Sequence, residues 1–221
     1  MPGVRWLRLL YTHPAHFSPS LVEAYTSLDH LLPYADLPLQ HIAQPILDSM
    51  GRHTSRRDIE RLIETLRSAR PDMVLRTSFI VGYPGETDEQ FNELLDFVRQ
   101  VRFDRLGAFA YSHEEGTRAA RLPGHLSPKI KRERLDALMS LQRDIAAENH
   151  QRLVGRQIEV IIDQGSDDPS AKAVGRIRGQ APDIDGVTHI ASDTALQPGA
   201  LITAKITAGG PYDLEGQAVP R

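Results

Sequence analysis

The spacing of apolar residues changes near residue 153 and divides the chain into two parts. Up to about residue 112, short apolar runs alternate with stretches whose apolar positions recur at helical spacing. After Gly155, short runs typical of β-strands follow one another with turn residues between them. The pattern therefore predicts two domains, an α/β domain over residues 1–153 and a small β-barrel over residues 154–221.

Four apolar runs of the first part are predicted to be strands: Trp6–Tyr11, Tyr34–Leu39, Val74–Val81 and Asp104–Tyr111. Helices are expected between them and after them, starting near Pro19, Pro45, Ser55, Thr87 and Pro128. Proline suits the first position of a helix, and the residues that follow Thr87 form a capping box with it. Strands that alternate with helices indicate a parallel sheet, in an open or closed barrel or in a doubly wound fold.

The second part contains four strand-like runs: Gln157–Asp163, Ala171–Arg178, Gly186–Ala191 and Leu201–Thr207. Turn signals such as Asp-Gly and Pro-Gly pairs separate them. Several short strands within about 65 residues favour a small antiparallel barrel of the oligonucleotide-fold kind.

Charge also distinguishes the two parts. The chain has 26 basic and 29 acidic residues, and the segment from Leu153 onward holds six of the basic and nine of the acidic ones. The first part is thus neutral, and the second carries the net charge of −3. Because nucleic-acid binding rests on Lys and Arg that neutralise phosphates, the acidic barrel is expected to bind a basic protein, with Asp183, Asp185 and Asp213 beside its turns.

The sequence contains no cysteine. This excludes disulfides, thiolate zinc sites, a cysteine nucleophile and iron–sulfur clusters bound by thiolates of this chain. No apolar run reaches the roughly 20 residues that a membrane helix needs. The first residues do not resemble a secretory signal either, so we expect a soluble, cytoplasmic protein.

Polar side chains collect where the predicted parallel strands end, which is the working edge of β-α folds. Strand alternation places Asp36 and Gln40 on one face of their strand, and Arg76 and Ser78 on one face of the next. With Tyr111 at the end of the last strand, these groups predict a polar ligand site. Hydrogen-bonded filling of a barrel interior explains an inward arginine or serine equally well.

Other polar groups have a plainer interpretation. His13 and His16 flank a proline in a loop without an acid at ligand spacing, so we expect loop histidines and no metal site. Glu114 and Glu115 precede a glycine and are expected in a solvated loop.

Five motifs together resemble radical S-adenosylmethionine methylthiotransferases. Leu37–His41 and Leu75–Thr87 resemble the core of that family. Gly107–Thr117, Gln180–Gly186 and Tyr212–Gly216 are most similar to its RimO branch. The resemblance covers nearly the whole chain and identifies it as a carboxy-terminal part, with a partial half-barrel followed by a TRAM domain.

The resemblance implies an enzyme of three parts, of which the first binds an iron–sulfur cluster through cysteines. The half-barrel holds a four-iron four-sulfur cluster through a CxxxCxxC motif and cleaves S-adenosylmethionine, and the third part is the TRAM barrel. In the RimO branch, the resulting radical reaction places a methylthio group on an aspartate of the twelfth small-subunit ribosomal protein. In a sister branch, the target is an adenosine of tRNA.

This sequence departs from the family because it has neither the first domain nor the CxxxCxxC motif. We therefore expect a fragment that is inactive alone, without catalytic or metal-binding residues of its own. A nucleoside-facing wall would remain, and the resemblance implies that it consists of Gln40, Arg76, Ser78, Ile80 and Tyr111.

Two other functions stay open. The chain could be the corresponding part of a tRNA adenosine methylthiotransferase, although the acidic barrel argues against a tRNA partner. It could also be a non-catalytic module whose barrel binds a ribosomal protein, with the half-barrel as a relic. A pull-down with ribosomal proteins and tRNA distinguishes these functions.

Overall fold

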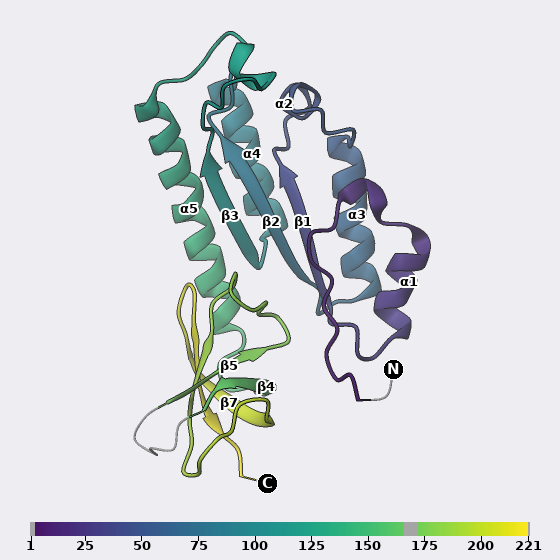
Figure 1. Ribbon diagram of the computed structural model, residues 1–221, viewed down its shortest axis with the longest axis vertical. Coiled ribbons are helices and arrows are strands. Elements are labelled where there is room, and N and C mark those ends of the chain that lie inside the picture. The colour runs from purple at the N-terminus through teal and green to yellow at the C-terminus, as the bar shows by residue number, and fades with distance from the viewer. Residues whose placement is uncertain (1–2, 166–171, 221) are drawn as a thin grey trace. The chain divides into compact units, whose positions relative to one another are not determined.

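The computed structural model describes residues 3–165 and 172–220 (Figure 1). It forms two compact units, residues 1–142 and 143–221. Asp167, Asp168 and Arg221, which enter the charge count of the barrel, lie outside the described residues, as does Ala171, the predicted start of a strand. Within the described part, no helix combines the length and apolar character needed to span a membrane.

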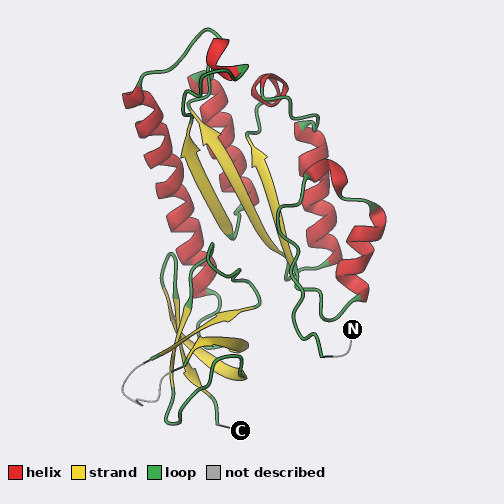
Figure 2. Cartoon of the chain, in the orientation of Figure 1, coloured by secondary structure: helices red, strands yellow, loops and turns green. Residues whose placement is uncertain are grey.

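The first unit alternates helices and strands as the apolar pattern predicts (Figure 2). Its elements are η1 Pro14–His16, α1 Pro19–Ser27, β1 Tyr34–Gln40, α2 Gln44–Ser49, α3 Arg56–Ala69, β2 Val74–Val81, α4 Asp88–Val101, β3 Arg105–Ala110, η2 Ala119–Arg121 and the start of α5, Pro128–Gln151. The three strands pair in parallel in the order β1-β2-β3. Predictions for these strands are confirmed to within one residue at each end.

Helix starts also follow from the sequence. Ser18 caps α1 by accepting a hydrogen bond from the Leu21 N–H, and Pro19 occupies the first helical turn. At α4, Thr87 and Gln90 form the predicted capping box, each side chain accepting from the backbone N–H of the other residue. Such caps satisfy N–H groups that have no partner inside the helix.

One face of the sheet is buried against helices. Along β2, buried and half-buried side chains alternate, with Leu75, Thr77, Phe79 and Val81 buried. The Phe79 ring lies edge-on to Phe103, with centroids 5.9 Å apart, and Phe103 in turn contacts Phe97 of α4. The opposite face of β2 is therefore only half-buried.

The predicted strand over Trp6–Tyr11 is wrong. Of that segment only Leu7 forms a bridge, to Leu31. Tyr11 has a left-handed φ of 57°, which ends an extended run, and its N–H is bound by the Asp36 side chain over 3.0 Å. The described sheet of the first unit therefore has β1 at its edge.

The second unit is a closed five-stranded barrel in the order β4-β5-β6-β8-β7. Its strands are β4 Gln157–Gln164, β5 Ala173–Ile177, β6 Thr188–Ala191, β7 Leu201–Gly209 and β8 Leu214–Ala218. Alternate residues of these strands fill the core, among them Val160, Ile162, Ile190, Ile206 and Leu214.

Two features of the barrel differ from expectation. The strand β8 was not predicted, because it contains few apolar residues and Gly216 at its centre. Gly216 packs tightly there, since a Cβ atom on it would lie 3.2 Å from Ile190 Cδ1. The barrel is also not wholly antiparallel, because β6 and β8 pair in parallel and thereby close it.

Candidate functional site

The end of β1 has an irregular backbone. A register shift falls between Leu37 and Gln40, so that Gln40 lies opposite Phe79, and Gln40 has a φ of 71°. Arg52 supports this bend by donating a hydrogen bond to the Pro38 carbonyl over 2.6 Å. Burial lowers the pKa of Arg52. The half-buried Gln40 side chain is thus held at the carboxyl edge of the sheet.

Three candidate residues share the half-buried face of β2. Arg76, Ser78 and Ile80 alternate with the buried positions and lie on one side of the strand. Of the three, Arg76 lies nearest the amino end of β2. Its Nη1 donates to Oδ1 of the fully buried Asp36 over 2.7 Å. Ser78 and Ile80 lie closer to the carboxyl end, beside Gly107 and Phe109 of β3.

Tyr111 follows β3 and belongs to a small cluster above the sheet edge. Its ring lies edge-on to Tyr83, with centroids 5.4 Å apart, and packs on the apolar cluster formed by Ala43, Ile46 and Tyr83. The phenolic oxygen of Tyr111 is buried and has no hydrogen-bond partner among the described residues. A buried hydroxyl of this kind is costly unless something bonds to it.

The five predicted residues therefore lie at two different heights along the strands of the sheet. Gln40, Ser78, Ile80 and Tyr111 lie at or near the carboxyl ends of the three strands, whereas Arg76 lies nearer the amino end of β2 and is paired with Asp36. The structure brings the first four to one edge and keeps Arg76 apart from that edge.

The same edge also holds a buried polar network whose residues were not among the predicted site residues. His41 Nε2 lies 3.2 Å from Glu86 Oε1, and both side chains are fully buried. Nδ1 of His41 accepts a hydrogen bond from the Ala43 N–H, which leaves Nε2 as the nitrogen whose N–H donates a hydrogen bond to Glu86. The other carboxylate oxygen accepts from the Gly82 N–H and pairs with Arg134.

The sequence contained a partial signal for this network. His41 ends one motif that carries the family resemblance, and Glu86 lies within another, Leu75–Thr87. Arg134 lies in an amphipathic helix, where arginine is ordinarily a surface residue, so its burial could not be expected.

Of the remaining candidates, Glu114 and Glu115 lie in a loop, as expected, whereas His16 ends the short helix η1 and His13 caps it. The His13 and His16 rings are 5.3 Å apart, and burial, Arg52 and then His16 lower the pKa of His13. Glu114 and Glu115 are exposed. Among the described residues, no group of three or more His, Asp or Glu side chains is arranged to hold a metal ion.

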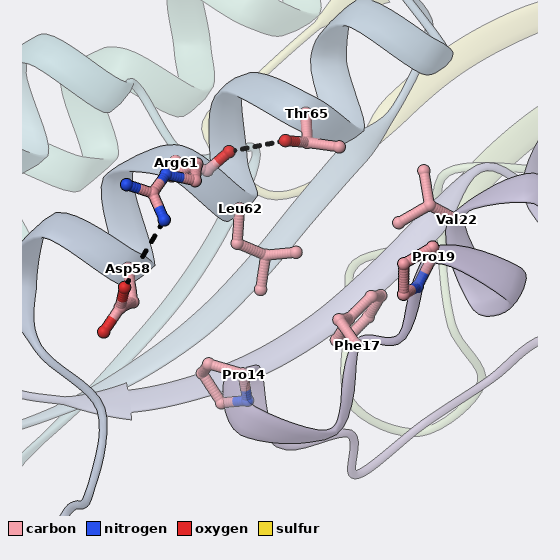
Figure 3. Close-up of a pocket in the computed structure, with 8 residues that line it drawn as sticks. All are labelled: Pro14, Phe17, Pro19, Val22, Asp58, Arg61, Leu62 and Thr65. Carbon is pink, nitrogen blue, oxygen red and sulfur yellow. Dashed lines mark hydrogen bonds and ion pairs between the residues drawn. The ribbon is translucent and has the colours of Figure 1, made fainter.

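An apolar pocket of about 420 Å³ lies elsewhere, between η1, α1 and α3 (Figure 3). Its lining residues are Pro14, Phe17, Pro19, Val22, Asp58, Arg61, Leu62 and Thr65. None of the five predicted site residues lines it. Its polar groups are engaged locally, since Asp58 forms a capping box with Ser55 at the start of α3 and Arg61 lies 3.9 Å from Asp58, so we assign no chemistry to it.

Comparison with protein families gives two matches. Residues 8–98 match the radical SAM superfamily, where SAM denotes S-adenosylmethionine, and residues 154–219 match the TRAM domain. The first region contains β1, β2 and most of α4, and the second contains the whole barrel.

Curated relatives match almost the entire chain. Proteins named ribosomal protein uS12 methylthiotransferase RimO from Desulforamulus reducens, Geotalea uraniireducens and Clostridioides difficile are 42%, 43% and 39% identical over 97%, 100% and 98% of it. The chain spans 48%, 49% and 48% of these relatives, so it corresponds to about half of their length.

Among solved structures, the fold is similar to that of coproporphyrinogen III oxidase from Escherichia coli, which is described as a radical SAM enzyme. The TM-score is 0.53 at 18% identity, over 63% of this chain and 32% of the other. At that identity the likeness concerns the fold alone.

Proposed function

Because the chain belongs to the radical SAM methylthiotransferase family of the RimO proteins and spans about half their length, we propose that it forms one half of a ribosomal protein uS12 methylthiotransferase. In this proposal the first unit binds the nucleoside part of S-adenosylmethionine, and the barrel binds the target protein. The observation that carries it is the polar edge formed by Gln40, Ser78, Ile80 and Tyr111.

The residues at this edge fit a nucleoside. Gln40 offers an amide and Ser78 a hydroxyl, both half-buried, and Ile80, opposite Phe109 of β3, offers an apolar side chain. The buried Tyr111 hydroxyl has no hydrogen-bond partner among the described residues and would gain one from a bound polar group. The role of these side chains would be to bind and orient the nucleoside at the carboxyl ends of the strands.

The residues do not fit an iron–sulfur cluster. The sequence contains no cysteine, and thiolates are the ligands that such clusters require. In the family, the cluster and S-adenosylmethionine together supply the radical that abstracts hydrogen from the target. The thiolates would therefore have to come from residues outside this sequence, and we assign no step of the reaction to a cluster here.

The barrel is proposed to bind the ribosomal protein. Three of its acids beside turns differ in their roles: Asp185 accepts from the Ala181 N–H, Asp213 accepts from the Val187 N–H, and Asp183 is exposed. Negative charge favours encounter with a basic protein and disfavours tRNA. Action on a ribosomal protein would place the enzyme in the cytoplasm.

A competition experiment tests the partner. The 221-residue chain should bind purified uS12 more tightly than tRNA at low salt, and the preference should weaken as salt rises. Tighter binding of tRNA would favour the sister function. Binding of uS12 without any affinity for S-adenosylhomocysteine would favour a non-catalytic binding module.

A further inference from the structure

The first turns of α5 contact the ends of two strands through Lys131. Its Nζ donates to the Tyr111 carbonyl over 3.0 Å and lies 4.8 Å from the centre of the Tyr111 ring. Its aliphatic stem lies against Gly82, where an added Cβ atom would be only 2.5 Å from Lys131 Cγ. One side chain thus spans from the end of β2 to the end of β3.

Arg134 lies about one helical turn after Lys131, and its buried side chain contacts Glu86 in the same region. Its Nη1 lies 2.9 Å from Glu86 Oε2 and 3.1 Å from the Glu86 carbonyl oxygen. Its Nη2 donates to Asp88 Oδ1 over 2.6 Å. The Glu86 carboxylate also accepts a hydrogen bond from the Gly82 N–H. It therefore links the Arg134 side chain to the backbone of Gly82.

Gly82, Glu86 and Arg134 form a buried hydrogen-bonded network with little freedom to move. The Glu86 side chain is fully buried and that of Arg134 is 7% exposed. Charge-assisted hydrogen bonds are among the strongest in proteins, and a shared buried acceptor couples its donors. A shift of α5 would therefore displace Gly82 and Tyr111 together.

We propose that Lys131 and Arg134 are positioning residues of the nucleoside site, which set the spacing between Gly82 at the end of β2 and Tyr111 at the end of β3. The proposal rests on the proposed function, since it concerns the same edge. Both residues lie between the radical SAM match at 8–98 and the TRAM match at 154–219. The linking helix would thereby contribute to a site that neither matched region contains in full.

Backbone NMR spectra of the chain and of three variants test this spacing without any ligand. Arg134→Gln should shift the amide resonances of both Gly82 and Tyr111. Lys131→Met, which keeps the aliphatic stem and removes the ammonium group, should shift Tyr111 most. Lys129→Met is the matched control, because Lys129 is exposed and pairs with the exposed Glu133 at 3.8 Å, and it should shift neither.

Titration with S-adenosylhomocysteine, followed in the same spectra, tests the consequence. Arg134→Gln and Lys131→Met should each weaken binding by up to about tenfold, the loss expected for one hydrogen bond of the folded site. Lys129→Met should bind like the parent. Urea unfolding separates this from stability, because Lys131→Met should stay folded even if Arg134→Gln does not.

The outcomes separate the two proposals. Unshifted Tyr111 and Gly82 resonances in Lys131→Met and Arg134→Gln would overturn the positioning role, whatever the ligand does. Unchanged affinity in both variants would overturn it too, while leaving the nucleoside site in place. A parent chain that does not bind S-adenosylhomocysteine would contradict the proposed function, and the ligand-free spectra would still decide the positioning role.

Discussion

Arg76 Nη1 donates to Oδ1 of Asp36 over 2.7 Å, joining β2 to the fully buried carboxylate of β1. The second oxygen of Asp36 accepts from the Tyr11 N–H over 3.0 Å. One carboxylate therefore holds both the neighbouring strand and the segment that runs along the edge of the sheet. Arg76 serves this pair, which distinguishes it from the candidates nearer the carboxyl ends.

Replacing Asp36 by Asn tests that assignment. The variant keeps the shape but removes the charge that faces Arg76, so the free energy of unfolding should fall by about 3 kcal/mol. Amide exchange should also accelerate at Tyr11. Asp72→Asn, which breaks the partly exposed pair with Arg70, is the control and should cost less than about 1 kcal/mol. Equal losses measured by urea unfolding would show that the buried pair is no more important than the surface pair.

Gly82 and Gly85 provide a matched pair for backbone and steric effects. Both have positive φ, 71° and 82°, so alanine at either site should cost roughly 1 kcal/mol from the backbone alone. Only at Gly82 would the new Cβ meet a neighbour, the Lys131 stem. Gly82→Ala should therefore lose more stability than Gly85→Ala, and adding Lys131→Ala should recover part of the difference. Equal losses would mean that α5 does not press on Gly82.

Asp104 should make stability depend on pH in an unusual direction. Burial raises the pKa of the Asp104 carboxyl above its ordinary value, although the Leu75 N–H donates to its carboxylate. A carboxyl whose pKa is higher in the folded state stabilises the fold below its unfolded pKa, and that contribution is lost as pH rises through the folded pKa. Relative to the parent, Asp104→Asn should therefore be more stable at about pH 7 than at about pH 3.5 in urea unfolding. The opposite trend would contradict the raised pKa.

Asp183 tests the charge of the barrel separately from its geometry. It is exposed and has a φ of 65°, a conformation that asparagine also tolerates. Asp183→Asn should therefore leave the fold intact and slow association with uS12 severalfold at low salt, with little effect at high salt. Asp193→Asn, another exposed acid of the same unit, is the comparison. If neither variant changes the association rate, the acidic surface does not steer the partner.

Local signals predicted much of the fold. Alternation along Val74–Val81 and the capping box at Thr87 fix a strand and a helix start within a few residues, so both could be read from the sequence. The segment Trp6–Tyr11 has the same apolar character as a strand, but its contacts, Leu7 with Leu31 and Tyr11 with Asp36, join residues that are distant along the chain. The strand β8 was missed for a similar reason, because its pairing with β6 and β7 outweighs its weak local pattern.

The candidate site shows the same limit. Alternation placed Arg76 and Ser78 on one face, since that depends only on neighbouring residues. The pairing of Glu86 with Arg134 joins residues 48 apart, and no spacing in the sequence predicts it. The contacts of Lys131 with Gly82 and Tyr111 are likewise tertiary, so the contribution of α5 became visible only in the folded chain.

The most direct test of the account is a mass spectrum of uS12. This chain should be joined to the remainder of the Clostridioides difficile relative, replacing the half that it matches, and expressed in cells that lack their own RimO. The account predicts that an aspartate of uS12 gains a methylthio group in these cells. Unmodified uS12 together with newly methylthiolated tRNA adenosines, while the intact relative modifies uS12 in parallel, would contradict it.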